Sequence, residues 1–337
     1  MQIEEKVIGE RVRIMSIKVT DYFDNTIMPM IRDDHSDIYT EMSIMILGSV
    51  GLGIDDKFSD MEAAVYLDDP AWHKHGARLQ LSLNECLAET NPWQKKGSII
   101  CVHPLSWLLD GQANSFFEGK SDLPWEKISI ESLFTIQENL IYYDPHATLA
   151  HLRKETSPLK YPEHIWRKSL LVKFRQLVSE DYSELKRCVI RNHMVESQIL
   201  LAPVLEGLLQ VAFLLDHQYF PWRTHLRWAF DRLSLPVSNF GTSIDRILSC
   251  DSWHEKIDII CNLIDDYKKY IADYALSSEI NIWSDDLDEE LLWAERLNAW
   301  ENPNWRDRII LLSKKASESG YSYSDFWVWS LWDSISE

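Results

Sequence analysis

The sequence has few of the residues that build metal clusters or disulfide frameworks. Its five cysteines are far apart and include no C-x-x-C pair and no Cys/His cluster with the spacing of a zinc site. No unbroken apolar run reaches the roughly 20 residues that a membrane span requires. The first residues mix acids with bases and lack the apolar core of a signal peptide. These absences predict a cytoplasmic protein with reduced thiols and no membrane association.

Basic residues are also scarce. The chain carries 34 lysines and arginines against 53 acids, which gives a formal net charge of -19. Such a charge repels a nucleic acid backbone at long range, and this argues against a nucleic acid partner. It favours a cationic small molecule, or a substrate that enters with magnesium. The alternative is an acidic surface that only maintains solubility.

Glycine is uncommon, with 11 residues in the whole chain, yet Gly48, Gly51 and Gly53 lie close together. A P-loop requires lysine after its last glycine, and here Ile54 follows Gly53. A dinucleotide fingerprint opens a helix, whereas these glycines precede an acidic turn and a second apolar run. The sequence therefore contains neither of these phosphate motifs.

The 337 residues are enough for two domains. Short apolar runs between turn residues predict strands at 42–49, 61–69, 77–83, 97–104 and 140–145, with a helix from Glu4 to Met30. After the prolines at 158 and 162 the pattern becomes helical, over 162–192, 194–220, 253–278 and 285–300. We expect an α+β domain, a mixed sheet with flanking helices, over 1–155, and an all-α helical bundle over 156–337.

The stretch from Gly48 to Glu62 combines a glycine-serine pair with two acids at the start of a predicted strand. Alternate residues of a strand point to one face, so Asp60 and Glu62 lie about 7 Å apart on the same side. Two carboxylates suit Mg²⁺, which binds hard oxygen ligands and leaves room for phosphate oxygens. Gly48 would allow a close approach of phosphate to the backbone, and Ser49 would donate hydrogen bonds to it.

This arrangement resembles the nucleotidyltransferase superfamily, the polymerase-β-like fold. Its signature is Gly-Ser, a connection of about ten residues, and Asp-x-Asp or Asp-x-Glu on a strand. Gly48, Ser49, Asp60 and Glu62 match it, and Ser59 completes the frequent Ser-Asp pair. The two-domain plan is similar to that of bacterial aminoglycoside and lincosamide nucleotidyltransferases. The resemblance implies that Asp60 and Glu62 are catalytic metal ligands and that Gly48, Ser49 and Ser59 bind the triphosphate.

A third carboxylate, which the family often supplies from a later strand, has no obvious counterpart. The strand at 97–105 contains no Asp or Glu, and His103 is its titratable candidate besides Cys101. Either His103 takes that position, or an acid such as Glu138, Asp144 or Glu196 does. A third alternative is weak or absent catalysis.

Four cations are further candidates for phosphate binding. Arg191, or Arg187 one turn before it, would face the triphosphate, and Glu196 would face the acceptor. The alternative is that these residues pair within their helices. Arg223 follows Tyr219, Pro221 and Trp222, a pattern that resembles a marker of the helical domain in one branch of the superfamily. Arg78, on the predicted strand at 77–83, would reach a phosphate or remain on the surface.

Three functions follow from the resemblance. The first is a magnesium-dependent transfer of a nucleoside monophosphate, AMP from ATP, to a hydroxyl of a small molecule, and the negative net charge favours a cationic one. The second is the same transfer to a protein or RNA acceptor. The third is a non-catalytic nucleotide-binding regulator. The sequence leaves the acceptor, the base and the oligomeric state open.

Overall fold

A computed structural model of the chain describes residues 19–91, 97–109, 114–117, 119, 122–234 and 238–277. Contacts divide the chain into two compact units. Unit 1 comprises the described residues up to Ile165 together with Tyr219–Ala229, and unit 2 comprises those of Trp166–Gln218 and from Phe230 onward. The predicted helix at 285–300 lies outside the described residues.

Unit 1 is built around a mixed four-stranded sheet with the order β3-β2-β1-β4. β1 (Ser43–Leu47) pairs antiparallel with β2 (Glu62–Leu67) and with β4 (Leu140–Tyr143), whereas β3 (Ile99–Pro104) is parallel to β2. The mixed sheet with flanking helices and these four strands are as the sequence predicts. The other elements of this unit are η1 (Phe23–Ile27), α2 (Met28–Asp34), α3 (Gly48–Gly51), α4 (Asp69–Thr90), η2 (Leu105–Leu109), α5 (Asn114–Phe117), η3 (Trp125–Lys127), α6 (Ile130–Glu138), α7 (Thr148–Glu155) and η4 (Pro158–Lys160).

The strand predicted at 77–83 is wrong, because these residues lie inside α4. The alternation of leucines there matches a strand, but Leu79 and Leu83 are buried while Leu81 is 63% exposed. Burial one turn apart is helical. Asp68 caps the start of this helix, because its side chain accepts a hydrogen bond from the Ala71 amide at 2.7 Å. Arg78 therefore lies on this helix, and its guanidinium donates a hydrogen bond to Asp37 at 3.0 Å.

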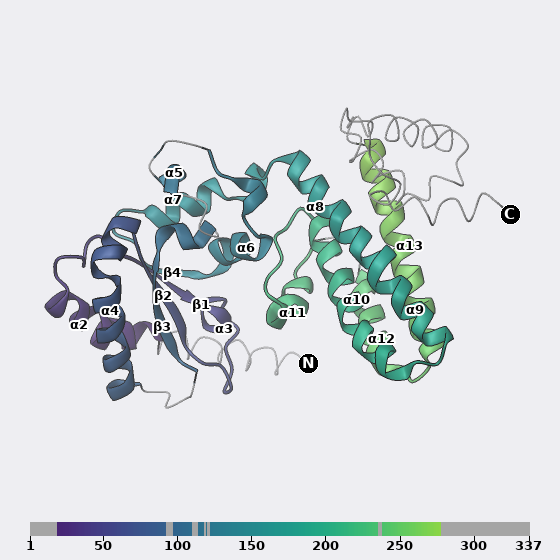
Figure 1. Cartoon of the computed structure of the whole chain (residues 1–337), viewed down its shortest axis with the longest axis horizontal. Coiled ribbons are helices and arrows are strands. Elements are labelled where there is room, and N and C mark those ends of the chain that lie inside the picture. Colours follow the sequence, from purple (N-terminus) through teal and green to yellow (C-terminus); the bar gives the residue numbers. More distant parts are fainter. Residues whose placement is uncertain are drawn as a thin grey trace. The chain divides into compact units, whose positions relative to one another are not determined.

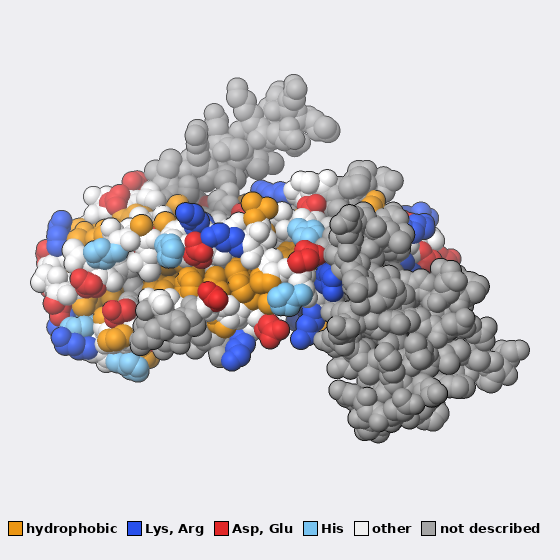
Figure 2. All heavy atoms as spheres, turned by 90° about the horizontal axis from the view of Figure 1, so that it is seen from above, with side chains coloured by type: hydrophobic (Ala, Val, Ile, Leu, Met, Phe, Trp, Pro, Cys, Tyr) orange, Lys and Arg blue, Asp and Glu red, His pale blue; other side chains and the backbone are white. Residues whose placement is uncertain are grey.

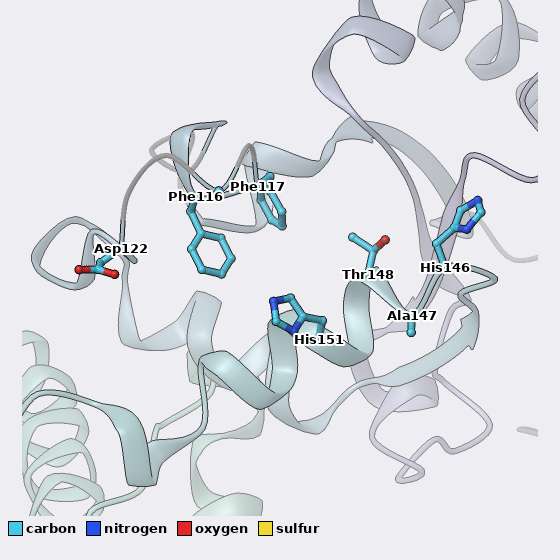
Figure 3. Close-up of a pocket in the computed structure, with 8 residues that line it drawn as sticks. Phe116, Phe117, Asp122, His146, Ala147, Thr148 and His151 are labelled. Carbon is cyan, nitrogen blue, oxygen red and sulfur yellow. The ribbon is translucent and has the colours of Figure 1, made fainter.

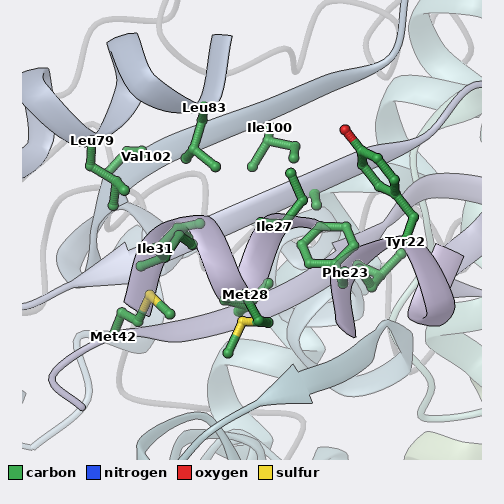
Figure 4. Packing of buried hydrophobic residues seen from close by; sticks show 14 of the residues in the cluster. Tyr22, Phe23, Ile27, Met28, Ile31, Met42, Leu79, Leu83, Ile100 and Val102 are labelled. Carbon is green, nitrogen blue, oxygen red and sulfur yellow. The ribbon is translucent and has the colours of Figure 1, made fainter. Parts of the chain in front are cut away.

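One face of the sheet is covered by α4 and by the helical segment from residue 19 to Asp34 (Figure 1). Figure 4 shows Phe23, Ile27 and Ile31 of that segment beside Leu79 and Leu83 of α4. Large side chains from the two helices fill the space above the strands, and each such burial contributes about 1.5–3 kcal/mol. The cluster also includes Ala63, Val65 and Leu67 of β2. Because side chains alternate, Glu62, Ala64 and Tyr66 must lie on the opposite face.

Unit 2 is helical, as expected for the second half of the chain. Its elements are α8 (Glu163–Arg175), which begins in unit 1, η5 (Gln176–Tyr182), α9 (Ser183–Ile190), α10 (Met194–Leu215), α12 (Ser238–Ser249) and α13 (Trp253–Ser277). Among the described helices, α10 alone is long and apolar enough to cross a membrane by length and composition. Half of its most apolar window is buried within the structure. The Tyr267 hydroxyl of α13 donates a 2.6 Å hydrogen bond to the Leu208 carbonyl of α10, which fixes these two helices together.

The segment Tyr219–Ala229 returns from the helical half to unit 1. It contains η6 (Arg223–His225) and most of α11 (Leu226–Phe230). The hydroxyl of Tyr219 donates a hydrogen bond to the carbonyl of Thr156 at 3.0 Å, and its ring packs edge-on against Tyr161. The motif that the sequence assigns to the helical domain therefore packs in unit 1.

Candidate functional site

The carboxylate pair, Asp60 and Glu62, lies at the entry to β2. Met61, between them, is buried with Ala63 in the core under α4. Asp60 and Glu62 therefore share the opposite side of the chain, as the strand alternation predicts. The Ile99 amide donates to the Met61 carbonyl at 2.9 Å, so β3 supports the strand at this point.

Glu62 lies against Gly48. The two residues are brought together because Leu47, the last residue of β1, pairs with Glu62. Gly48 adopts a φ of +60°, and a Cβ placed on it would be 2.8 Å from Oε2 of Glu62. Glycine is thus required both for the backbone conformation and for the close approach of the carboxylate.

Asp60 lies against a second glycine, Gly97, which the sequence does not identify. Gly97 has a φ of +121°, and a Cβ on it would be 2.6 Å from Oδ2 of Asp60. Each acid of the pair therefore lies against a glycine with positive φ, a conformation that residues with a side chain rarely adopt. A glycine at the first position of a predicted strand was the available signal, but the contact with Asp60 depends on the parallel pairing of β2 and β3.

The electrostatics of the pair suit a divalent cation. Burial of the carboxyl raises the pKa of Glu62, and the charge of Asp60 raises it further. The pKa of Cys101 is raised by burial and then by the charge of Glu62. Two close carboxylates repel each other, and a cation between them would relieve that repulsion. Over the described part of the chain, no three His, Cys, Asp or Glu residues gather as a metal cluster. The donor set fits Mg²⁺, which commonly takes one or two carboxylates together with substrate phosphates.

The two serines of the motif have different surroundings. Ser49 lies in α3, directly after Gly48, and its carbonyl accepts a hydrogen bond from Ile54 at 2.9 Å. Ser59 closes a tight turn: its hydroxyl accepts from the Asp56 amide at 2.9 Å and donates to Asp56 Oδ1 at 3.1 Å. The Ser59 hydroxyl thus positions Asp60, the next residue, and its predicted phosphate contact stays a prediction.

His103 is not brought to the carboxylate pair. In the register of β2 and β3, His103 pairs with Tyr66, which is four residues beyond Glu62. Four residues of strand separate the backbone positions of Glu62 and His103 by about 13 Å along the sheet. Its ring stacks on Trp107 with centroids 4.2 Å apart, and burial lowers its pKa. The register therefore does not bring His103 next to Glu62.

Two other candidates for the third acid lie at opposite ends of the sheet. Asp144 accepts hydrogen bonds from the Ser43 hydroxyl and from the amides of Thr148 and Ala150, each at 2.9 Å, so it caps α7 at the far end of β1. Glu138 is exposed at the end of α6, and Leu140, two residues on, pairs with Ile46, so Glu138 lies at the end of the sheet that carries Glu62 without joining the carboxylate pair in a metal cluster.

Three further predicted residues are exposed in two different places. Arg191 and Glu196 lie in unit 2, at the turn between α9 and α10, and their assignment to nucleotide and acceptor remains a prediction. Arg223 lies in η6 of the returning segment, within unit 1.

A cavity of about 720 Å³ lies in unit 1 between α5 and α7. Figure 3 shows Phe116 and Phe117 projecting from α5, and Thr148 and His151 from α7. Part of the cavity lining, His146 to Thr148, comes directly after β4 in the chain. β4 ends at Tyr143, which pairs with Ile44 near the start of β1. Glu62 pairs with the last residue of β1, so the cavity and the carboxylate pair belong to opposite ends of the sheet.

The charges of the described surface are mixed. On the face drawn in Figure 2, acidic, basic and histidine side chains are interspersed among hydrophobic ones. The negative net charge is therefore not gathered into one region of that face.

Comparisons with known proteins give limited matches. A family model described as a domain of unknown function (DUF4037) matches residues 125–229. The matched span ends at Ala229, where the returning segment of unit 1 ends, and it does not include the carboxylate pair. The crystal structure of a nucleotidyltransferase-like protein from Exiguobacterium sibiricum 255-15 is 12% identical, with a TM-score of 0.38; the match covers 87% of this chain and 92% of that one. No curated protein matches the sequence.

Proposed function

We propose that the protein is a magnesium-dependent nucleotidyltransferase that moves a nucleoside monophosphate, AMP from ATP, onto a hydroxyl of a small molecule. The observation that carries this proposal is the carboxylate pair at the entry to β2, with Glu62 against Gly48 of the Gly-Ser turn and Asp60 against Gly97. These are the residues through which the sequence resembles the nucleotidyltransferase superfamily.

Asp60 and Glu62 would hold the magnesium, which stabilises the charge that develops on the attacking and leaving oxygens. Gly48 keeps the space beside Glu62 clear of a side chain, and Ser49 and the adjacent amides would bind phosphate oxygens. In the transfer, the acceptor oxygen forms a bond to the α-phosphorus as the bond to the β-phosphate oxygen breaks and pyrophosphate leaves. The protein orients these groups, which is the main contribution that such a reaction requires.

A non-catalytic nucleotide-binding regulator is the second candidate function. It is favoured by one observation: in the part of the chain that the structure describes, no third acid or histidine joins the carboxylate pair. Transfer to a protein or RNA acceptor is a further outcome of the same tests.

Thermal shift with ATP, GTP, CTP and UTP, each with and without Mg²⁺, tests nucleotide binding. We expect ATP to stabilise the protein in a Mg²⁺-dependent manner, and Asp60→Asn and Glu62→Gln to remove that dependence. Asp33→Asn is a matched control, because Asp33 is an exposed carboxylate on α2. If no triphosphate stabilises the wild type, or if Asp60→Asn retains full Mg²⁺ dependence, the proposed site is wrong.

Pyrophosphate release then separates the functions. Release on addition of hydroxylated metabolites or aminoglycosides supports transfer to a small molecule. Label from [α-³²P]ATP on protein or RNA supports a macromolecular acceptor. Nucleotide binding without release in any of these mixtures supports the regulator.

A further inference from the structure

Asp55 is a buried carboxylic acid without a hydrogen-bond partner. The residue is 5% exposed, and neither Oδ1 nor Oδ2 has a hydrogen-bond partner on another residue. Burial raises the pKa of this carboxyl, its own backbone amide offsets part of the rise, and the charge of Asp56 adds to it. An unpaired carboxyl inside a protein costs free energy whether or not it is ionised. A protein can retain such a group when the carboxyl gains a partner in another functional state, such as the ligand-bound one.

The position of Asp55 in the chain is next to the candidate site. The Ser59 amide donates to the Asp56 carbonyl at 3.2 Å, which closes a four-residue turn. The first and last Cα atoms of such a turn are within about 7 Å. Asp55 precedes this turn and Asp60 follows it, so the two acids flank a turn whose ends lie close together.

Asp55 also joins two pieces of chain that are each held by their own hydrogen bonds. On one side, the Ile54 amide donates to the Ser49 carbonyl at 2.9 Å and completes the turn of α3. On the other side, Asp56 and Ser59 bind each other through backbone and side chain. A rotation about the side-chain torsions of Asp55 would therefore turn its carboxyl while the bonds on either side stay intact.

We propose that Asp55 is the third acidic ligand of the metal and nucleotide site, buried in the free protein and turned outward beside Asp60 when the magnesium nucleotide binds. This inference rests on the proposed function. It explains two observations together: a buried acid without a partner, and a carboxylate pair without a third acid within the described structure. It differs from the expectation that this acid comes from a later strand. The Asp55 carboxylate would gain the metal as a partner only when the magnesium nucleotide is bound. The outward rotation of Asp55 would therefore favour nucleotide binding.

The test compares Asp55→Asn, Asp55→Glu and the control Asp33→Asn by isothermal titration with ATP, in Mg²⁺ and in EDTA. We expect Asp55→Asn to bind ATP at least tenfold more weakly than the wild type in Mg²⁺, and with unchanged affinity in EDTA. We expect Asp55→Glu to recover part of that loss, because it retains the carboxylate. In the absence of Mg²⁺ and nucleotide, the melting temperature of Asp55→Asn should equal or exceed that of the wild type.

The outcomes separate this inference from the proposed function. If Asp60→Asn loses the Mg²⁺ dependence while Asp55→Asn stays within twofold of the wild type, Asp55 is not a ligand and the inference alone fails. A lower melting temperature of free Asp55→Asn, with unchanged Mg²⁺ dependence, would show a structural role and would equally overturn it. If the wild type itself shows no Mg²⁺-dependent ATP binding, both are wrong.

Discussion

Alanine at Gly48 separates backbone strain from the contact with Glu62. Gly48 has a φ of +60°, where an L-residue costs about 1–2 kcal/mol. Alanine also restricts the unfolded chain, which offsets about 0.4–1 kcal/mol of that cost. We therefore expect Gly48→Ala to lower the free energy of unfolding by about 1 kcal/mol.

The larger effect concerns the site. The added methyl would lie 2.8 Å from Oε2 of Glu62, closer than such atoms approach, so one of the two groups must move. The carboxylate is the end of a flexible side chain, so it rotates away at little cost in stability and leaves Asp60. Loss of one ligand should weaken Mg²⁺-dependent ATP binding at least tenfold, which is about 1.4 kcal/mol.

Gly53 provides the matched control. Its φ is +70°, and nothing lies within 4 Å of the position where a Cβ would be. Gly53→Ala should lower the free energy of unfolding as much as Gly48→Ala does, and leave Mg²⁺-dependent binding unchanged. Urea unfolding and isothermal titration measure the two quantities. Equal loss of binding in both variants would refute the role assigned to the Gly48–Glu62 contact.

Three further predictions concern the fold and the charge of the site. Leu79→Ala should cost about 2–5 kcal/mol of unfolding free energy and the exposed Leu81→Ala less than about 0.5 kcal/mol, since only the first is buried; similar costs in urea unfolding would contradict the helix. Asp144→Ala should cost about 1–2 kcal/mol, because it removes the cap of α7, and an unchanged urea midpoint would contradict this. Because the pKa of Glu62 is raised, this carboxyl binds its proton more tightly in the folded protein than in the unfolded chain. Without divalent cations, the free energy of unfolding should therefore fall as the pH rises from the ordinary pKa of glutamate through the raised one. Glu62→Gln should flatten this dependence of stability on pH, and an unchanged dependence would contradict the raised pKa.

The strands were predictable because they are short apolar runs between turn residues. β1 and β2 are buried along almost their whole length, so their sequences are apolar without interruption. The error at 77–83 arose because a seven-residue window cannot distinguish alternate leucines of a strand from an amphipathic helix. The cap at Asp68 and the length of α4 decide that question, and both lie outside the window.

The site was predictable to the extent that it is local in sequence. Gly48, Asp60 and Glu62 belong to one strand-turn-strand unit, and strand geometry alone places the two acids together. Gly97 and the distance of His103 depend on the register between β2 and β3, which no single segment contains. The burial of Asp55 depends on how the loop packs, and its sequence, two acids in a polar turn, suggests exposure instead.

The return of the chain to unit 1 has a consequence for biosynthesis. Tyr219 is buried in unit 1, and its hydrogen bond to Thr156 spans 63 positions. During translation at about 5–20 residues per second, this unit cannot complete its packing until the helices between Ile165 and Tyr219 have also emerged from the ribosome. A gene fragment that stops at residue 165 should therefore yield a protein that keeps the contact of Tyr161 with Trp125 but lacks the one with Tyr219, and that aggregates even though it encodes the whole sheet.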